Sequence, residues 1–151
     1  MTMTGYAIRA RRRALGLSQH DVARLSGVKQ PLLSAIEAGR RQPTEAVAAA
    51  LRDPLRVRPS IMLASLRPEV TRLVRAHRGR EASVFGSVAK GVDRPGSDLD
   101  IMVDFEPDAD ITDLLALQDD LSELLTIPVD IVSAGSSSRL VVTIREEAMP
   151  L

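Results

Sequence analysis

Residues 84–100 read VFGSVAKGVDRPGSDLD, passing from apolar side chains through a Gly-Ser turn and a polar loop to two carboxylates. Val84 and Phe85 are typical of the end of a strand, and the alternating run that begins at Asp98 predicts a second strand. Asp98 and Asp100 are two positions apart, so a strand projects both carboxylates to one face. Like charges this close repel each other, and a divalent cation between them would relieve the repulsion.

The Gly-Ser turn, Gly86 and Ser87, suits an anion. Glycine lets the backbone approach a phosphate closely, and the N–H groups of a short following helix, with the Ser87 hydroxyl, can hold phosphate oxygens. A phosphate cradle and a metal-binding pair beside two neighbouring strands predict a site that handles nucleotides. A surface loop followed by solvated acids is the alternative, and the apolar residues interleaved with the acids disfavour it because they indicate a buried strand.

These residues match the pattern GS-x-A-x-G…SD-x-D, and the chain here resembles the minimal members of the polymerase-beta-type nucleotidyltransferase superfamily. The resemblance implies an α/β (α+β) domain with a small mixed sheet and a third carboxylate on a later strand, which residues 128–133, PVDIVS, supply as Asp130. It implies transfer of AMP from ATP with two Mg²⁺ ions. The catalytic and metal-binding residues would be Asp98, Asp100 and Asp130, and the nucleotide-binding residues would be Gly86, Ser87, Lys90 and Ser97.

Charge is distributed unevenly along the 151 residues, although 20 basic and 20 acidic residues balance overall. Residues 1–80 hold 16 Lys and Arg against 5 Asp and Glu, a net of +11, whereas residues 81–151 hold 4 against 15, a net of −11. This asymmetry predicts two modules, the first with a polyanionic partner. The chain has no Cys, which excludes disulfides and thiolate metal sites. No apolar run is long enough for a membrane span, so we expect a cytoplasmic protein without a membrane partner.

The basic N-terminal part predicts four short helices separated by glycines and by a proline. Residues 15–44, LGLSQHDVARLSGVKQPLLSAIEAGRRQPT, resemble the lambda-repressor/Cro (XRE) family of helix-turn-helix domains, which implies an all-α domain that binds operator DNA as a homodimer. A plain helical bundle with solvated arginines is the alternative. Pro31 departs from the family pattern by replacing a polar residue in the third helix. The implied DNA-binding residues are Arg12, Gln19, Lys29, Gln30, Leu32, Ser34, Arg40 and Arg41.

The proline-containing segment 53–60, DPLRVRPS, predicts a domain boundary, so we expect a helix-turn-helix domain at residues 1–58 and a nucleotidyltransferase domain at 59–151. In the second domain we expect helices over residues 69–77, 111–125 and about 138–147. Strands are expected over 82–85 and 98–105 and around Asp130. His20 and His77 are expected to be exposed helix residues without chemistry.

The acceptor of the nucleotide is the open question at this point. Larger relatives carry an extra domain for antibiotics or RNA ends, and a chain ending at Leu151 has no room for one, which favours a protein acceptor. The resemblance extends to antitoxins paired with HEPN-type ribonuclease toxins, and a repressor-type domain suits an antitoxin that represses its own operon. The leading hypothesis is therefore a bifunctional antitoxin. A transcription factor that only senses nucleotide, and a small-molecule nucleotidyltransferase, are the alternatives.

Overall fold

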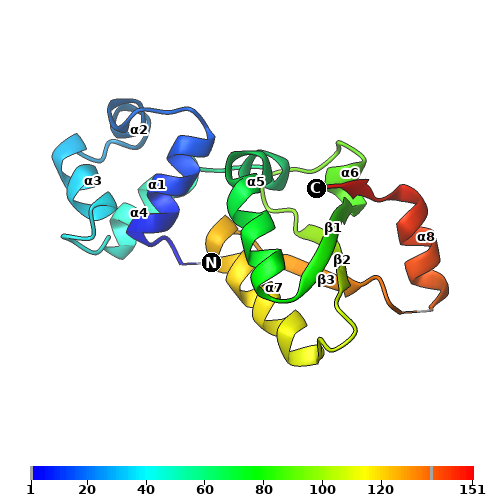
Figure 1. Ribbon diagram of the computed structural model, residues 1–151. Coiled ribbons are helices and arrows are strands. Elements are labelled where there is room, and N and C mark those ends of the chain that lie inside the picture. The colour runs from blue at the N-terminus through cyan, green and yellow to red at the C-terminus, as the bar shows by residue number, and fades with distance from the viewer. Residues whose placement is uncertain (1, 137) are drawn as a thin grey trace. The chain divides into compact units, whose positions relative to one another are not determined.

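The computed structural model describes residues 2–136 and 138–151. The chain forms two compact units that divide between Val57 and Arg58. The first is entirely helical, and the second combines helices with one four-stranded sheet (Figure 1). This architecture confirms the predicted fold class. No helix in the described part of the chain is long and apolar enough to cross a membrane.

Within residues 2–57 the first unit forms four helices, and three of them begin at a residue whose side chain caps the helix. Thr4, Ser18 and Thr44 each accept a hydrogen bond from a backbone N–H of the first turn, and Ser18 forms a full capping box with Asp21. Pro31 lies in the first turn of its helix, where a missing N–H costs little. The helices are α1 (Gly5–Ala14), α2 (Gln19–Ser26), α3 (Gln30–Glu37) and α4 (Glu45–Arg52).

Aliphatic side chains from all four helices form the core of this unit, as expected for a chain with 2% aromatic residues. Between α2 and α3 the chain turns at Gly27, whose positive φ of 74° favours glycine. The buried members of the core are Ile8, Val22, Val28, Leu33, Ile36, Leu51 and Leu55.

The second unit is built around a mixed sheet with strand order β3-β2-β1-β4. β1 pairs antiparallel with β2 and β4, while β2 and β3 are parallel. The elements in chain order are α5 (Pro59–Ala76), β1 (Gly79–Phe85), α6 (Gly86–Ala89), β2 (Leu99–Phe105), α7 (Ile111–Leu125), β3 (Val129–Ser133), α8 (Arg139–Glu147) and β4 (Met149–Pro150).

Helices cover the two faces of this sheet unequally. α5 and α7 lie side by side (Figure 1), where α5 packs against β1 and α7 packs against β3. Leu99, Ile101 and Val103 of β2 are fully buried at alternate positions, so we infer that they point to this side. Met102 points to the opposite face and packs against Val141 and Ile144 of α8. The alternation along β2 therefore places Asp100 on the α8 face, outside the main core.

The structure corrects several predicted boundaries. α5 begins at Pro59, about ten residues before the predicted start, and bends at Leu66, whose φ and ψ of −123° and 19° are non-helical. Pro59 is a good first residue for a helix, and the bend accommodates Pro68, which cannot donate a backbone hydrogen bond. β1 starts at Gly79 rather than at residue 82. The two-residue strand β4 was not predicted, because so short a run has no detectable alternation.

Candidate active site

Strand pairing brings the predicted acids together. In the parallel ladder of β2 and β3, Asp100 is the register partner of Asp130, and in the antiparallel ladder with β1 it is opposite Phe85. Gly86 follows Phe85 directly, so the Gly-Ser turn and two of the three acids lie in one row across the sheet. Asp98 immediately precedes β2 and is exposed.

Gly86 is required at its position by conformation and by space. Its φ of +64° lies in the left-handed region, and a side chain there would collide with Oδ2 of Asp100. The turn backbone and the Asp100 carboxylate are therefore direct neighbours. The following residues form the single turn of α6, with Ser87 half-buried in it.

The carboxylates influence one another electrostatically. Burial raises the pKa of Asp100 above its usual range, and the nearby carboxylates of Asp130 and Asp98 raise it further. A cation near Asp100 would oppose all three effects. This concentration of negative charge is what the sequence predicted for the site.

The fit to magnesium rests on the donor chemistry. Within residues 2–136 and 138–151, no three His, Asp or Glu side chains lie close enough to form a complete metal-binding cluster. Mg²⁺ typically takes one or two carboxylates together with substrate phosphates and water, so it does not need a cage made only of protein. Hard carboxylate oxygens beside a turn that can hold phosphate fit that requirement. The assignment of Asp98, Asp100 and Asp130 as ligands stays a prediction.

Two predicted nucleotide-binding residues have partners within the chain. The Lys90 ammonium lies 3.1 Å from a carboxylate oxygen of Glu147 in α8, with both side chains about half exposed. Ser97 Oγ accepts a hydrogen bond from the Arg94 backbone N–H at 3.0 Å. Their roles toward nucleotide remain predictions, and Lys90 would have to leave Glu147 to reach a phosphate.

Three predicted DNA-binding side chains form contacts within the first unit: those of Arg12, Gln19 and Gln30. Arg12 forms a two-pronged ion pair with Glu37, with N–O distances of 2.7 and 2.9 Å, and its side chain is only 13% exposed. Gln19 donates to Glu37 and accepts from Gln30. The structure thus gives Arg12 an internal ion pair that the sequence did not indicate, and its contact with a DNA phosphate stays a prediction.

The other predicted DNA-binding residues differ in exposure. Lys29, Arg40 and Arg41 are exposed, whereas Leu32 is partly buried against the core. Arg9 and Arg13 were not predicted as contacts, yet they are exposed and line a shallow pocket together with Gln19 and Ser34. Their spacing of four residues on a helix, which places both on one face, is the signal that could have identified them.

His77 corrects a further expectation. It ends α5, its side chain is only 20% exposed, and its Nε2 lies 2.7 Å from Oδ2 of Asp120 in α7. It therefore connects two helices instead of standing in solvent.

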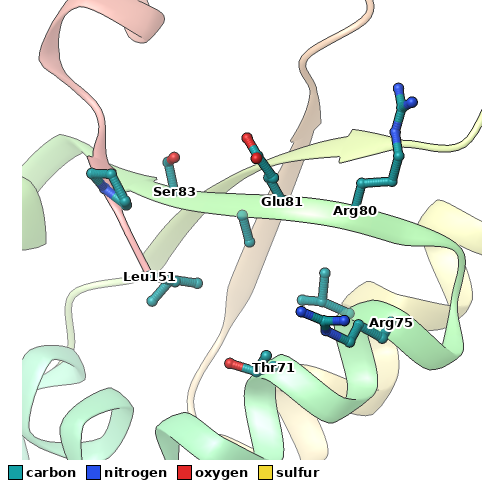
Figure 2. A pocket seen from close by; sticks show the side chains of 9 residues that line it. Thr71, Arg75, Arg80, Glu81, Ser83 and Leu151 are labelled. Carbon is teal, nitrogen blue, oxygen red and sulfur yellow. The ribbon is translucent and has the colours of Figure 1, made fainter.

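A pocket of about 440 Å³ lies away from the acids, between α5, β1 and the C-terminal residues (Figure 2). Thr71, Arg75 and Leu151 lie on one side of β1, while Glu81 and Ser83 point away from them. None of the three predicted catalytic acids lines this pocket, so it is separate from the candidate active site.

Comparison with protein families supplies the deciding observation. Residues 63–151 match the family described as "Nucleotidyltransferase domain", and this region contains the Gly-Ser turn and all three acids. The chain belongs to this nucleotidyltransferase family. Residues 8–61 match the family described as "Helix-turn-helix", so this nucleotidyltransferase also carries a helix-turn-helix domain. Both resemblances inferred from the motifs are confirmed.

Individual relatives are similar to part of this chain. A candidate protein adenylyltransferase of Methanocaldococcus jannaschii, MJ1215, is 34% identical over 71 residues, covering 47% of this chain and 83% of the relative. The protein adenylyltransferase MntA of Thermococcus cleftensis is 40% identical over 57 residues, covering 38% of this chain and 58% of MntA.

Solved structures agree on the fold. The structure of a candidate minimal nucleotidyltransferase is 40% identical, with a TM-score of 0.55 over 61% of this chain and 95% of that one. A toxin–antitoxin structure with AMP-PNP is 23% identical, with a TM-score of 0.50 over 55% of this chain and 69% of that one, a likeness of fold alone.

Proposed function

We propose that this nucleotidyltransferase transfers AMP from ATP to a protein partner and represses its own operon through the helix-turn-helix domain. The proposed transfer of AMP rests on one observation, namely that the Gly-Ser turn, Asp100 and Asp130 lie in one row across the sheet. The names of the similar adenylyltransferases support AMP as the transferred group and a protein as the acceptor. We propose a HEPN-type toxin as that acceptor, which makes this chain an antitoxin.

The chain's own residues would divide the chemistry between them. The backbone of the Gly86 turn and the Ser87 hydroxyl bind the terminal phosphates of ATP. Asp98 and Asp100 would hold Mg²⁺, with Asp130 sharing it; bound Mg²⁺ neutralises phosphate charge and lowers the pKa of an acceptor hydroxyl. Asp130, exposed at its register position opposite Asp100, accepts the hydroxyl proton.

Label transfer tests this function. The full chain is incubated with Mg²⁺, with ATP labelled on the α-phosphate and with the protein encoded beside it. Label on the partner, with release of pyrophosphate, is expected, and ATP labelled on the γ-phosphate should leave the partner unlabelled. ATP binding without turnover would favour a transcription factor that only senses nucleotide. Label on a small molecule would favour a small-molecule nucleotidyltransferase.

Ser87→Ala tests the phosphate turn. A hydrogen bond to a charged group contributes about 1.5 to 3 kcal/mol, so transfer should fall by roughly one to two orders of magnitude. Ser136→Ala is a control in an exposed segment after β3. A change below about twofold in Ser87→Ala would show that this serine only shapes the turn.

The proposed operator binding predicts different effects for residues that contact bases and for residues that contact phosphates. Gln30→Ala should relax sequence preference at one operator position, at about 1 to 3 kcal/mol. Arg41→Ala should weaken binding to all duplexes alike and reduce the salt slope by about one. Fluorescence anisotropy of the full chain on promoter and random duplexes at several salt concentrations measures both. Equal affinity of the parent protein for the two duplexes would contradict operator recognition, and with it the proposed homodimer on two half-sites.

A further inference from the structure

Asp93 is a buried carboxylate in the loop that joins α6 to β2. Its side chain is fully buried, and it lies between the two parts of the motif without belonging to either. It accepts hydrogen bonds from Nη2 of Arg58 at 2.8 Å and from the backbone N–H of Ser60 at 2.9 Å. A carboxylate buried this deeply is stable only with such partners, so the loop is attached firmly to the start of α5.

The start of α5 needs this carboxylate. The first N–H groups of a helix have no partner within it, and the N-cap residue Arg58 makes no side-chain capping bond within the described residues. Asp93 supplies the missing acceptor from a segment 33 residues further along the chain. An anion at this end also complements the dipole of the first segment of α5, before the bend at Leu66.

The pKa of Asp93 agrees with this arrangement. Burial acts to raise it, but the hydrogen bonds from Ser60 and Arg58 and the positive charge of Arg58 together hold it below its usual range. Asp93 is therefore ionised at neutral pH, and its ion pair is intact there.

Backbone hydrogen bonds connect the neighbours of Asp93 to both parts of the motif. The Val92 N–H donates to the carbonyl of Ser87 in the phosphate turn at 3.0 Å. On the other side, Arg94 and Ser97 exchange two hydrogen bonds, at 2.9 and 3.0 Å, directly before Asp98. Asp93 is therefore next to Val92, which is hydrogen-bonded to the phosphate turn. It is also next to Arg94, which begins the turn that leads to Asp98.

We propose that Asp93, held by Arg58, is a positioning residue that sets the placement of the phosphate turn relative to the metal-binding acids. This inference rests on the proposed nucleotidyl transfer at Asp98 and Asp100. The Asp93 side chain is fully buried, so its effect on nucleotide and acceptor passes through Ser87 and Ser97 and not through direct contact. Misplacement of reacting groups by about 1 Å can cost about a hundredfold in rate, which is the scale of effect available to this anchor.

The test compares Asp93→Asn with Asp120→Asn in the full chain. Asp93→Asn keeps an oxygen for Ser60 and loses the ion pair, while Asp120→Asn alters the contact with His77 at the opposite end of α5, far along the helix from the loop. Both variants should lower the thermal stability. Only Asp93→Asn should raise the KM for ATP and reduce kcat/KM, by about ten- to a hundredfold.

Arg58 supplies a second pair of variants. Arg58→Met removes the charge and should reproduce the effect of Asp93→Asn, whereas Arg58→Lys should restore most of the activity. Hydrogen exchange, measured below the melting transition of every variant, should show faster exchange of the Val92 and Ser97 amides in Asp93→Asn and Arg58→Met only.

The outcomes separate this inference from the proposed function. If the parent protein transfers no label, the proposed function fails, and binding of Mg²⁺ with a fluorescent ATP analogue then replaces KM as the measure of positioning. A different outcome is that the parent is active while Asp93→Asn loses only thermal stability and keeps its KM for ATP and its slow hydrogen exchange at Val92 and Ser97. In that case Asp93 is a helix cap and the positioning role is wrong.

Discussion

Asp98→Asn combined with Asp100→Asn should reduce transfer of labelled AMP by at least about a thousandfold while leaving the affinity for DNA unchanged. Metal-assisted stabilisation of a reacting phosphate contributes several kcal/mol, and each 1.4 kcal/mol is a factor of ten in rate. Asparagine has almost the same shape as aspartate, so β2 should keep its pairing. The DNA affinity should persist because the helix-turn-helix domain lies in a separate compact unit.

Asp104→Asn is the matched control for this prediction. Asp104 lies on the same strand, two residues beyond Met102, and its carboxylate pairs with Arg80 at 3.2 Å on the surface. Removing such an exposed pair should change stability by no more than about 1 kcal/mol and leave transfer intact. If the double variant transferred as much label as Asp104→Asn, the assignment of Asp98 and Asp100 as catalytic residues would be ruled out.

Arg12→Ala should destabilise the helix-turn-helix unit by about 3 to 5 kcal/mol, because it leaves the carboxylate of Glu37 buried without its cation. The Glu37 side chain is only 4% exposed, and its other described side-chain partner is the neutral amide of Gln19. A small domain has a free energy of unfolding of only about 5 to 15 kcal/mol. Hydrogen exchange of α1 and α3 should therefore become faster by about two to four orders of magnitude.

Arg24→Ala is the matched control, since Arg24 forms an exposed pair with Asp21 at 3.5 Å. It should change exchange rates by less than about tenfold. The same measurement decides between the two roles considered for Arg12. A phosphate contact would leave protection in α1 and α3 unchanged and would only weaken DNA binding uniformly, with a lower salt slope.

The Arg12–Glu37 pair also predicts the response of this unit to acid. Burial acts to raise the pKa of Glu37, but hydrogen bonds from Arg12 and Gln19 outweigh it, so the pKa is lower in the folded state than in the unfolded chain. The stability contributed by the pair is complete above the unfolded value of about 4.3 and is lost as the pH falls through the folded value. Exchange in α1 and α3 at decreasing pH, corrected for intrinsic rates, should show this loss in the parent protein and not in Arg12→Ala.

Local patterns in the sequence predicted most elements of both units. Glycines and a proline marked the boundaries between the helices of the first unit, and α7 has the predicted bounds, Ile111–Leu125, because its broad apolar stripe is a local signal. The Gly-Ser turn and the acid pair were found because their residue types and spacing are set by chemistry within a short segment. The bend in α5 was missed, since proline ends most helices and only packing shows where a helix continues past one.

Sequence alone determined where turns, strands and acids occur, because those choices depend on neighbours within a few residues. Tertiary structure alone decided which charges meet: Arg12 with Glu37 across 25 residues, Arg58 with Asp93 across 35, and Lys90 with Glu147 in α8. The local sequence around an arginine does not show whether its side chain will be exposed or buried against a carboxylate. The difference between the two cases is the desolvation of both charges, and that depends on long-range packing which no local pattern records.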